Sequence, residues 1–383
     1  MLYIASFCFA IEAHAINFTP KTEFEYQAQQ RILNQSGLSS YDTVLDHYFI
    51  AKSDLLLDFN PSWGWEIQPE VRMLWSDGTV LPLTDPASIQ LPRADRRIWA
   101  NGASFDSSKT VGTFNFERLN VIYRFNGGEF LVGRRAVTLG NFRTLIILNK
   151  FAQAPLQSQG YPFYFGQDGA TFSYGAAFYQ MRAISILGSH SKRDVYLIDN
   201  KISGNGYEFQ LFGGKWWDWF ALGFAPTLDV YGSSVRGELL SVPEDGMLQA
   251  GLGFERAIDT NFKLVIESLY QNLGLPHTQA LTPTSPSPYM IFRSKLIALT
   301  QLEFTGLSFW NFSGGLARSF TDSSMMGSLR IQYSASDHWD LYADSRFPLS
   351  STWGEFSSKS IDFPGGKSIG QTSYINFGVK FFF

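Results

Sequence analysis

Segments in which apolar and polar residues alternate recur along this chain, and they constrain its fold more than any other feature. The last one, TSYINFGVKFFF, carries on one face Ile375, Phe377, Val379, Phe381 and Phe383. A period of two residues indicates a β-strand, because successive side chains point to opposite faces of a sheet. The same period appears in WGWEIQPEVRMLW, MLQAGLGFER, FKLVIESLYQ and WDLYADSRF. The sequence therefore predicts a fold made of many strands.

The absence of a long apolar run argues against a helical membrane protein but is compatible with a transmembrane β-barrel. A transmembrane helix needs about 20 consecutive apolar residues, and the sequence contains no such run. A transmembrane strand needs only about ten residues, with every second one apolar. Aromatic residues make up 16% of the chain, and several tryptophans fall at the ends of alternating segments, where interfacial girdles lie. They are Trp63, Trp75, Trp216, Trp217, Trp219, Trp310 and Trp339. We expect an antiparallel up-and-down transmembrane β-barrel in the bacterial outer membrane, because only closure satisfies every strand edge in lipid.

The spacing of turn residues predicts the number of strands. Turn signals fall at 60–62, 126–128, 176–177, 217–218, 232–233, 257–261, 306 and 336–337, and long connections at 32–43, 76–113, 140–168, 188–204, 272–292 and 348–371. In a barrel, short periplasmic turns alternate with longer outer loops, and the strand number is even. Short turns and outer loops alternate without a break if residues 219–242 hold three short strands, with an outer loop near Pro226. That interpretation gives about 18 strands, and a single strand in 219–242 gives the alternative of 16.

The N-terminus has the features of an export signal. Residues 1–15 form an apolar stretch that ends in Ala13-His14-Ala15, a small-x-small cleavage pattern. No Lys or Arg precedes the stretch, and Glu12 lies inside the cleavage region, so residues 1–15 fit a truncated signal. A buried first strand is the alternative. Cleavage would remove Cys8, the only cysteine, and with it thiol catalysis and disulfides. Residues 16–383 are expected to form the barrel.

Charged residues within the strands are expected to face the lumen, since a charge on the lipid face costs about 2–4 kcal/mol at the bilayer midplane. The candidate pore-lining or constriction residues are Glu66, Glu70, Arg72, Arg118, Arg124, Arg134, Arg143, Lys150, Arg236, Glu238, Glu267, Arg330, Asp344 and Arg346. Over all the strand positions assigned to the lumen face, rather than these candidates alone, acidic and basic residues nearly balance, which predicts weak ion selectivity. The alternative for each residue is a cross-strand pair that stabilises the wall.

The connection at 140–168 is the expected constriction. It contains TLIILNKFAQAPL, which is unusually apolar for an exposed loop. Folding into the barrel mouth would bury these residues against the wall and bring Arg143 and Lys150 to the pore. Alternatively, Thr144 to Leu148 forms a strand or a subunit contact, so an oligomer is possible.

Short motifs resemble those of one group of porins. EFLVGRRAVTLGNFR, followed by FGQDGATFSYG, matches the pattern G-R-x-x-x-x-x-G-x-x-R and then D-G-x-x-x-x-Y at Gly133, Arg134, Gly140, Arg143, Asp168, Gly169 and Tyr174. This pattern resembles alginate-export-like and related substrate-specific porins. The resemblance implies, as an alternative function, a substrate-specific channel or exporter for an anionic sugar or polysaccharide. The sequence departs from the family at Arg135, where the family has Gln. A polyanion exporter also needs a strongly basic lumen, which the balanced charges do not provide.

The final residue resembles another known signal. A terminal Phe with apolar residues at every second position before it is similar to the assembly signal of outer-membrane barrels. The resemblance implies that the barrel assembly machinery is a partner through Phe383. The membrane setting implies outer-membrane lipid and lipopolysaccharide as further partners.

Enzymatic and nucleic-acid functions have little support. The net charge of -4 and the scattered basic residues give no nucleic-acid surface. His190, in Ser189-His190-Ser191, is the one histidine that suggests a rim hydrolase. A base beside a serine in sequence is not a catalytic pair without a hydrogen bond and an orienting carboxylate. We expect no cofactor, no metal and no enzyme. The predicted function is passive diffusion of small hydrophilic solutes, with a rim hydrolase as the alternative from another class.

Overall fold

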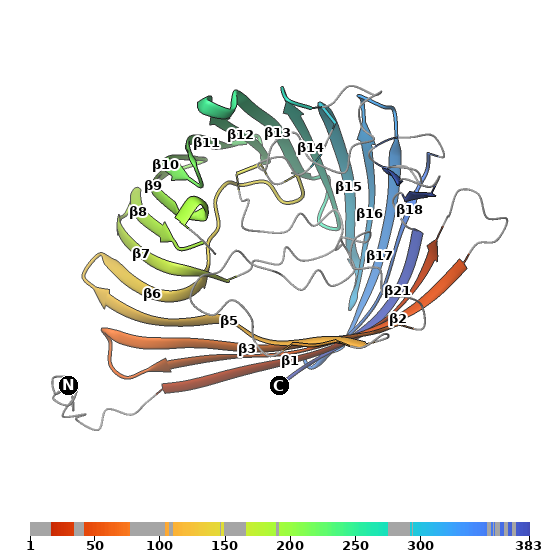
Figure 1. The fold of residues 1–383 in the computed structure, drawn as a ribbon, viewed down its shortest axis with the longest axis horizontal. Helices are drawn as coiled ribbons and strands as arrows, with labels where there is room; N and C mark the ends of the chain where they lie inside the picture. Colours follow the sequence, from red (N-terminus) through yellow and green to blue (C-terminus); the bar gives the residue numbers. More distant parts are fainter. Residues whose placement is uncertain are drawn as a thin grey trace.

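Each barrel strand of this chain pairs with its neighbours in sequence, and the last barrel strand pairs with the first (Figure 1). The computed structural model describes residues 17–33, 42–76, 104–106, 110–145, 147–148, 166–188, 191–274, 292, 294–350, 354, 356, 361–363, 367–369 and 373–383. Within these ranges, eighteen antiparallel strands form a closed ring. The structure confirms the predicted barrel and the count of 18.

The barrel strands follow one another around the ring in chain order. They are β1 Asn17–Leu33, β2 Asp42–Asp58, β3 Trp63–Ser76, β5 Thr110–Phe125, β6 Gly128–Ala136, β7 Gly166–Ala176, β8 Tyr179–Ile186, β9 Val195–Gly204, β10 Tyr207–Trp216, β11 Trp219–Val230, β12 Ser233–Val242, β13 Met247–Ala257, β14 Phe262–Gln271, β15 Leu296–Leu307, β16 Trp310–Ser319, β17 Met325–Ser336, β18 Trp339–Pro348 and β21 Ser373–Phe382. Short β4 (Ser104–Asp106) pairs with β5, and β19 (Ile361–Phe363) pairs with β20 (Lys367–Ile369) in a separate two-stranded sheet. Two 3-10 turns, η1 (Ser191–Arg193) and η2 (Pro243–Asp245), lie in connections at one end.

The seam between β1 and β21 closes the ring. Their register runs from Glu23 opposite Phe382 to Ile32 opposite Ser373. At the end of the seam, the N–H of Phe383 donates to the carbonyl of Thr22 at 3.0 Å. The ring of Phe383 meets that of Phe24 edge-on, with the centroids 5.7 Å apart. The terminal Phe therefore extends the seam by one residue.

The middle of the chain differs from the predicted turn assignment. The expected loop at 188–204 contains β9, and the turn at this point is Asn205-Gly206. Trp217-Asp218 joins β10 to β11 at the opposite end, among the longer connections. The region 219–242 holds two strands, β11 and β12, rather than the predicted three. The prediction therefore missed one strand, β9, and added one in 219–242, and the two errors cancel in the total of 18.

Pro226 misled the prediction because proline usually marks an interruption of a strand. It lies inside β11, where the β11–β12 register is interrupted between Phe224–Leu239 and Thr227–Arg236. Proline has no N–H to donate to a ladder. The local gap in pairing is therefore what allows it within a barrel strand.

The two faces of the wall differ as the alternation predicts. Large apolar side chains are exposed on the outside, for example Leu252 (69%) and Phe377 (61%). Aromatic pairs ring the short-turn end, with centroids 4.7 Å apart for Trp63–Tyr123 and 4.3 Å for Trp339–Phe381. Trp216 does not belong to this girdle, because it is fully buried in the interior. In the described part of the chain, no helix is long and apolar enough to cross a membrane.

A lysine on the outer face should destabilise the barrel in lipid. We expect Leu252→Lys, at the centre of β13, to lower the free energy of unfolding by about 2–4 kcal/mol. The measurement is urea unfolding of the protein refolded into lipid vesicles. Gln301→Lys, on the lumen face of β15 beside Glu303, is the control and should cost far less. Equal losses in both variants would mean that the outer face does not contact lipid.

Candidate pore and constriction

The segment that follows β6 leaves the wall and runs into the lumen toward β12–β14 (Figure 1). Leu145, Ile147 and Leu148 are completely buried in it. They join an apolar cluster on the inner wall that includes Leu240 and Met247. The described residues of this segment, 137–145 and 147–148, are called the inner loop below. Thr144 to Leu148 form no strand in the described residues, and they pack on the wall of their own barrel.

A glycine on the wall makes room for the inner loop. A Cβ at Gly251 of β13 would lie 2.5 Å from Cδ1 of Ile147 and 2.6 Å from the ring of Phe142. Real Cβ atoms do not approach so closely. Gly251 therefore lets the loop side chains reach the strand backbone.

Glu238 of β12 binds the backbone of the inner loop with both carboxylate oxygens. Oε1 accepts from the N–H of Asn141 at 2.5 Å and of Phe142 at 2.8 Å. Oε2 accepts from the N–H of Ile147 at 3.2 Å and of Leu148 at 3.1 Å. One side chain thus joins both ends of the loop's bend.

Glu267 of β14 acts in the same way on the middle of the bend. Its Oε1 accepts from the N–H of Arg143 at 2.8 Å, and its Oε2 from Thr144 at 2.9 Å and Leu145 at 2.7 Å. Buried backbone donors need partners, and charged acceptors make the stronger bonds. Glu238 and Glu267 are 3% and 1% exposed, so they lie beneath the loop and not on an open pore wall.

Arg143 is the charged residue of the inner loop, and 45% of its side chain is exposed. Its guanidinium pairs with Glu255 at 3.0 Å and with Glu303 at 3.8 Å. Lys263 bridges the same two carboxylates at 3.4 and 2.9 Å. Arg236 also pairs with Glu255, and its Nη1 donates to the carbonyl of Asn141 at 3.1 Å. This mixed cluster places both signs of charge beside the loop.

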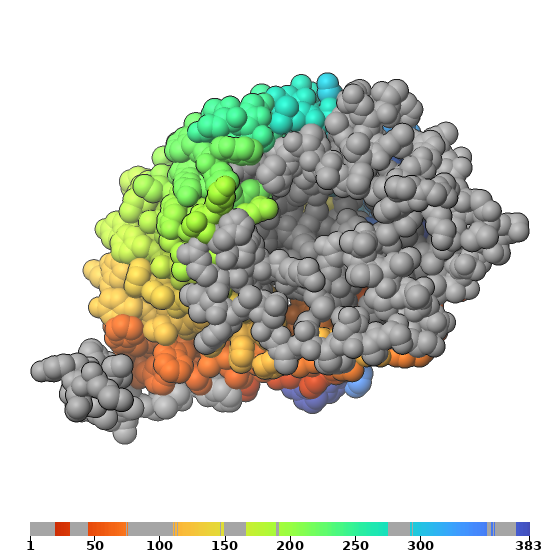
Figure 2. Space-filling model, in the orientation of Figure 1, coloured from red at the N-terminus to blue at the C-terminus, as the bar shows by residue number. Residues whose placement is uncertain are grey.

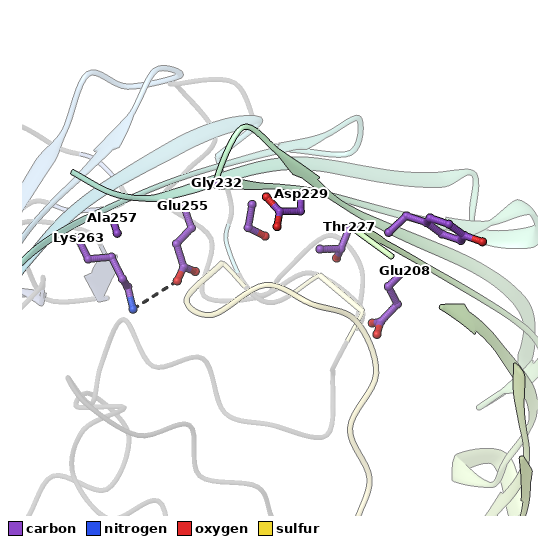
Figure 3. A pocket seen from close by; sticks show the side chains of 10 residues that line it. Glu208, Thr227, Asp229, Gly232, Glu255, Ala257 and Lys263 are labelled. Carbon is purple, nitrogen blue, oxygen red and sulfur yellow. Dashed lines mark ion pairs between the residues drawn. The ribbon is translucent and has the colours of Figure 1, made fainter. Parts of the chain in front are cut away.

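A cavity of about 400 Å³ opens beside the cluster, toward the short-turn end. Figure 3 shows Lys263 and Glu255 facing one another across part of it, with Glu208, Thr227 and Asp229 farther along the wall. Its lining includes Glu208, Asp229, Glu255 and Lys263 and so carries both signs of charge, which suits hydrated solutes.

The candidate residues on β3 and β5 are paired. Arg118 binds Glu66, and Arg72 binds Glu70 with its Nη2 at 3.1 Å from Oε2. Arg124 binds Asp58 at 2.7 Å.

Arg134 and Asp168, from the two quoted motifs, meet as a buried bidentate pair with distances of 2.8 and 3.2 Å. The Nη1 of Arg134 also donates to the carbonyl of Phe116 at 3.0 Å, close to where β5–β6 pairing ends at Leu119–Arg134. This pair therefore stabilises the wall at the point where the two strands separate.

The remaining described candidates lie near the seam. Arg330 stacks on Tyr342 at 4.8 Å, Arg346 stacks on Tyr374 at 5.1 Å, and Asp344 accepts from Asn376 at 3.1 Å. All three charged residues are buried. These three residues thus contact neighbouring side chains of the wall, and their lining of the conducting path stays a prediction.

Some predicted positions lie outside the described residues. They are Lys150, the loop beyond residue 148, Ser189-His190, and the expected export signal at 1–15. Among the residues that the structure does describe, no group of three or more His, Cys, Asp or Glu side chains is placed to hold a metal ion.

Sequence reasoning did not select the residues that hold the stem of the inner loop. Gln210 accepts from the N–H of Gly140 at 3.0 Å, and Arg182 donates to the carbonyl of Thr138 at 3.0 Å. Both are polar residues at inward positions. The alternation of residues predicts that the side chains of Gln210 and Arg182 point inward. Their partners, however, belong to the inner loop, and the alternation of the strands does not predict the path of that loop.

The comparisons bear on the fold. No family model and no curated protein matches the sequence. Among solved structures, Acinetobacter baumannii OccAB3 gives a TM-score of 0.58 at 10% identity over 96% of this chain and 99% of that chain. Acinetobacter baumannii OccAB4 gives 0.57 at 7% identity over 98% and 100%, and Pseudomonas aeruginosa OccK8 (OprE) gives 0.55 at 8% over 96% and 98%. The chain thus has the closed eighteen-strand fold of bacterial outer-membrane porins.

Removing Glu238 should loosen the inner loop. Glu238→Ala leaves four loop N–H groups without their acceptor, and an unpaired buried donor costs about 1–3 kcal/mol. We expect the amides of Asn141, Phe142 and Leu148 to exchange at least about tenfold faster with deuterium. Glu208→Ala, which removes a partly exposed pair with Lys201 away from the inner loop, is the control. Unchanged exchange in Glu238→Ala would show that apolar packing alone holds the loop.

Proposed function

We propose that this protein is an outer-membrane channel through which small hydrophilic solutes diffuse passively. The observation that carries the proposal is the division of the closed wall between an apolar outer face and a charged inner face. Eighteen strands enclose a wide lumen, and the inner loop narrows it from one side (Figure 1). Water-filled barrels of this size are channels rather than packed cores.

The charges beside the inner loop favour general diffusion over selection of one ion type. Arg143, Arg236 and Lys263 contact Glu255 or Glu303. Local selectivity comes from rings of like charge at a constriction, and here cations and carboxylates alternate. The cluster therefore supports a channel for neutral or zwitterionic solutes better than one for a polyanion, and it gives no catalytic arrangement.

Assembly is proposed to depend on the C-terminal residue. Phe383 is 66% exposed on the outside of the seam, next to the rings of Phe381 and Phe24. An exposed terminal aromatic suits recognition by the assembly machinery before the seam closes.

Conductance in a planar lipid bilayer tests the channel. We expect the refolded protein to give steady current steps that rise in proportion to salt concentration. A folded barrel that gives no steps would contradict the proposal, because its lumen would then be closed. The fold of each preparation is checked by its heat-modifiable migration in electrophoresis.

Arg143 should set the small ion preference that the channel has. One unit charge acting through water over about 8 Å changes an ion's energy by about 0.5 kcal/mol. We expect Arg143→Gln to raise the cation-to-anion permeability ratio about twofold, measured as the reversal potential across a salt gradient. Arg256→Gln removes an exposed charge at the end of β13, on the outward face shared by Leu252. If both variants behave alike, Arg143 does not line the conducting path.

A further inference from the structure

The strands β1 and β21, red and blue at the lower edge of the barrel in Figures 1 and 2, pair although no turn joins them. In a hairpin the turn fixes the register. Alternation excludes only shifts by an odd number of residues, because a shift by two keeps every side chain on its own face. Shifting this seam by two residues would therefore also close the barrel, with another stagger and hence another width. Other contacts must select the observed register.

The first such contact is the pairing of Lys380 on β21 with two carboxylates of β1. Lys380 lies opposite Glu25, and its Nζ is 3.2 Å from the Glu25 carboxylate and 3.5 Å from that of Glu23. The side chains of Lys380 and Glu25 are 13% and 7% exposed. Charges shielded from water to this degree depend on their partners, so the number of carboxylates near Lys380 distinguishes one register from another.

The order of charges on β1 gives Lys380 two carboxylates in one register only. From the short-turn end, the inward face of β1 carries Lys21, Glu23, Glu25, Gln27 and Gln29. A shift of β21 by two residues toward the short-turn end would put Lys380 opposite Glu23, with Lys21 in the place that Glu23 has now. A shift the other way would put it opposite Gln27, with Glu25 as its one carboxylate. Both shifts lose an attractive contact, and the first adds a repulsive one.

A proline opposes the shift toward the short-turn end as well. The N–H of Phe383 donates to the carbonyl of Thr22 at 3.0 Å, and the N–H of Thr22 donates back at 3.4 Å. Every second residue of a strand bonds to the same neighbour, so Pro20 is the next residue of β1 on this side. Proline has no N–H to donate. Moving Phe383 opposite Pro20 would therefore lose a hydrogen bond of the seam.

Tyr342 of β18 ties a third strand to the same register. Its ring crosses Gly378 of β21, where a Cβ would lie 2.1 Å from Cζ of the ring, so the ring needs a glycine at this position. Its hydroxyl then reaches over β21 and donates to Glu25 of β1. A shift of the seam toward the long connections would bring Gln27 under the hydroxyl. Tyr342 would lose its charged acceptor, which makes the stronger bond.

We infer that Pro20, Lys21, Glu25, Tyr342 and Lys380 form a register clamp, which selects one closed barrel from those that alternation allows. They act as positioning residues. They fix the stagger of the seam, and with it the width of the lumen and the alignment of the charges on β1–β3 with those on β17–β21. The clamp concerns how the ring closes, so it does not depend on which solute the channel conducts.

The test is disulfide formation across the seam in the whole refolded chain, in a Cys8→Ser background. Gln29→Cys/Asn376→Cys places the thiols opposite one another in the observed register. Gln27→Cys/Asn376→Cys places them opposite after a shift by two residues toward the short-turn end. With the clamp intact, the first pair should oxidise at least about fivefold faster than the second, since a disulfide needs close Cβ atoms.

The double variant Pro20→Val/Lys21→Glu should release the clamp in one direction. It supplies the missing N–H and gives Lys380 two carboxylates in the shifted register. We expect the second cysteine pair to gain at least about fivefold on the first, the size of effect that one charge-assisted hydrogen bond has. The matched control Pro20→Val/Lys21→Gln supplies the N–H without the carboxylate and should shift far less. Unchanged cross-linking in the double variant, or an equal shift in the control, would overturn the inference.

Gln27→Glu tests the opposite direction and does not depend on the folding of the double variant. It gives Lys380 two carboxylates when β21 moves by two residues toward the long connections, where Arg31→Cys/Asn376→Cys would meet. We expect this cysteine pair to gain at least about fivefold on the pair of the observed register. Gln301→Glu, on the lumen face of β15 away from the seam, should leave the ratio unchanged. No gain with Gln27→Glu, in a barrel shown to be folded by its heat-modifiable migration, would contradict the clamp.

Discussion

The backbone hydrogen bonds between β1 and β21 close the ring, and the other features of the barrel depend on that closure. In lipid no water is present to pair with a free strand edge, so an open sheet of these strands would leave a row of unpaired groups on β1 and β21. Once the ring is closed, the apolar faces of all the strands together form the outer surface of the barrel, and their polar faces together form the inner surface. The register from Glu23–Phe382 to Ile32–Ser373 brings together the two ends of the described chain.

Closure also creates an interior that the strands alone do not fill. Near the long connections the inner wall of β8–β14 is apolar, with Leu197, Phe212, Trp216 and Leu240 buried there. An apolar wall facing a water-filled lumen is unfavourable. The inner loop covers part of it with Leu145, Ile147 and Leu148, at the cost of burying several backbone N–H groups. Glu238 and Glu267 accept hydrogen bonds from those groups, so apolar burial and carboxylate binding depend on each other.

The charges of the wall divide into two kinds. Arg134 with Asp168, and Arg346 against Tyr374, are buried and contribute to the integrity of the wall. Arg143 and Lys263 reach the lumen beside the loop, where solutes would pass. Exposure distinguishes the two kinds, since a charge screened from the lumen by its partner has little influence on a passing ion.

The alternation of residues by itself determined the fold class, the outward face of each strand, the need for closure and an even strand count. Period-two patterning is local, and lipid leaves few ways to satisfy a strand. Turn assignment failed at Pro226 and at Trp217-Asp218, since the break in pairing that admits a proline depends on the neighbouring strand. Inward position was likewise predictable for Glu238 and Glu267, but their role was not. The sequence presents them as pore charges, whereas the tertiary structure buries them beneath residues about a hundred positions away, because long-range backbone contacts leave no periodic signal in a single sequence.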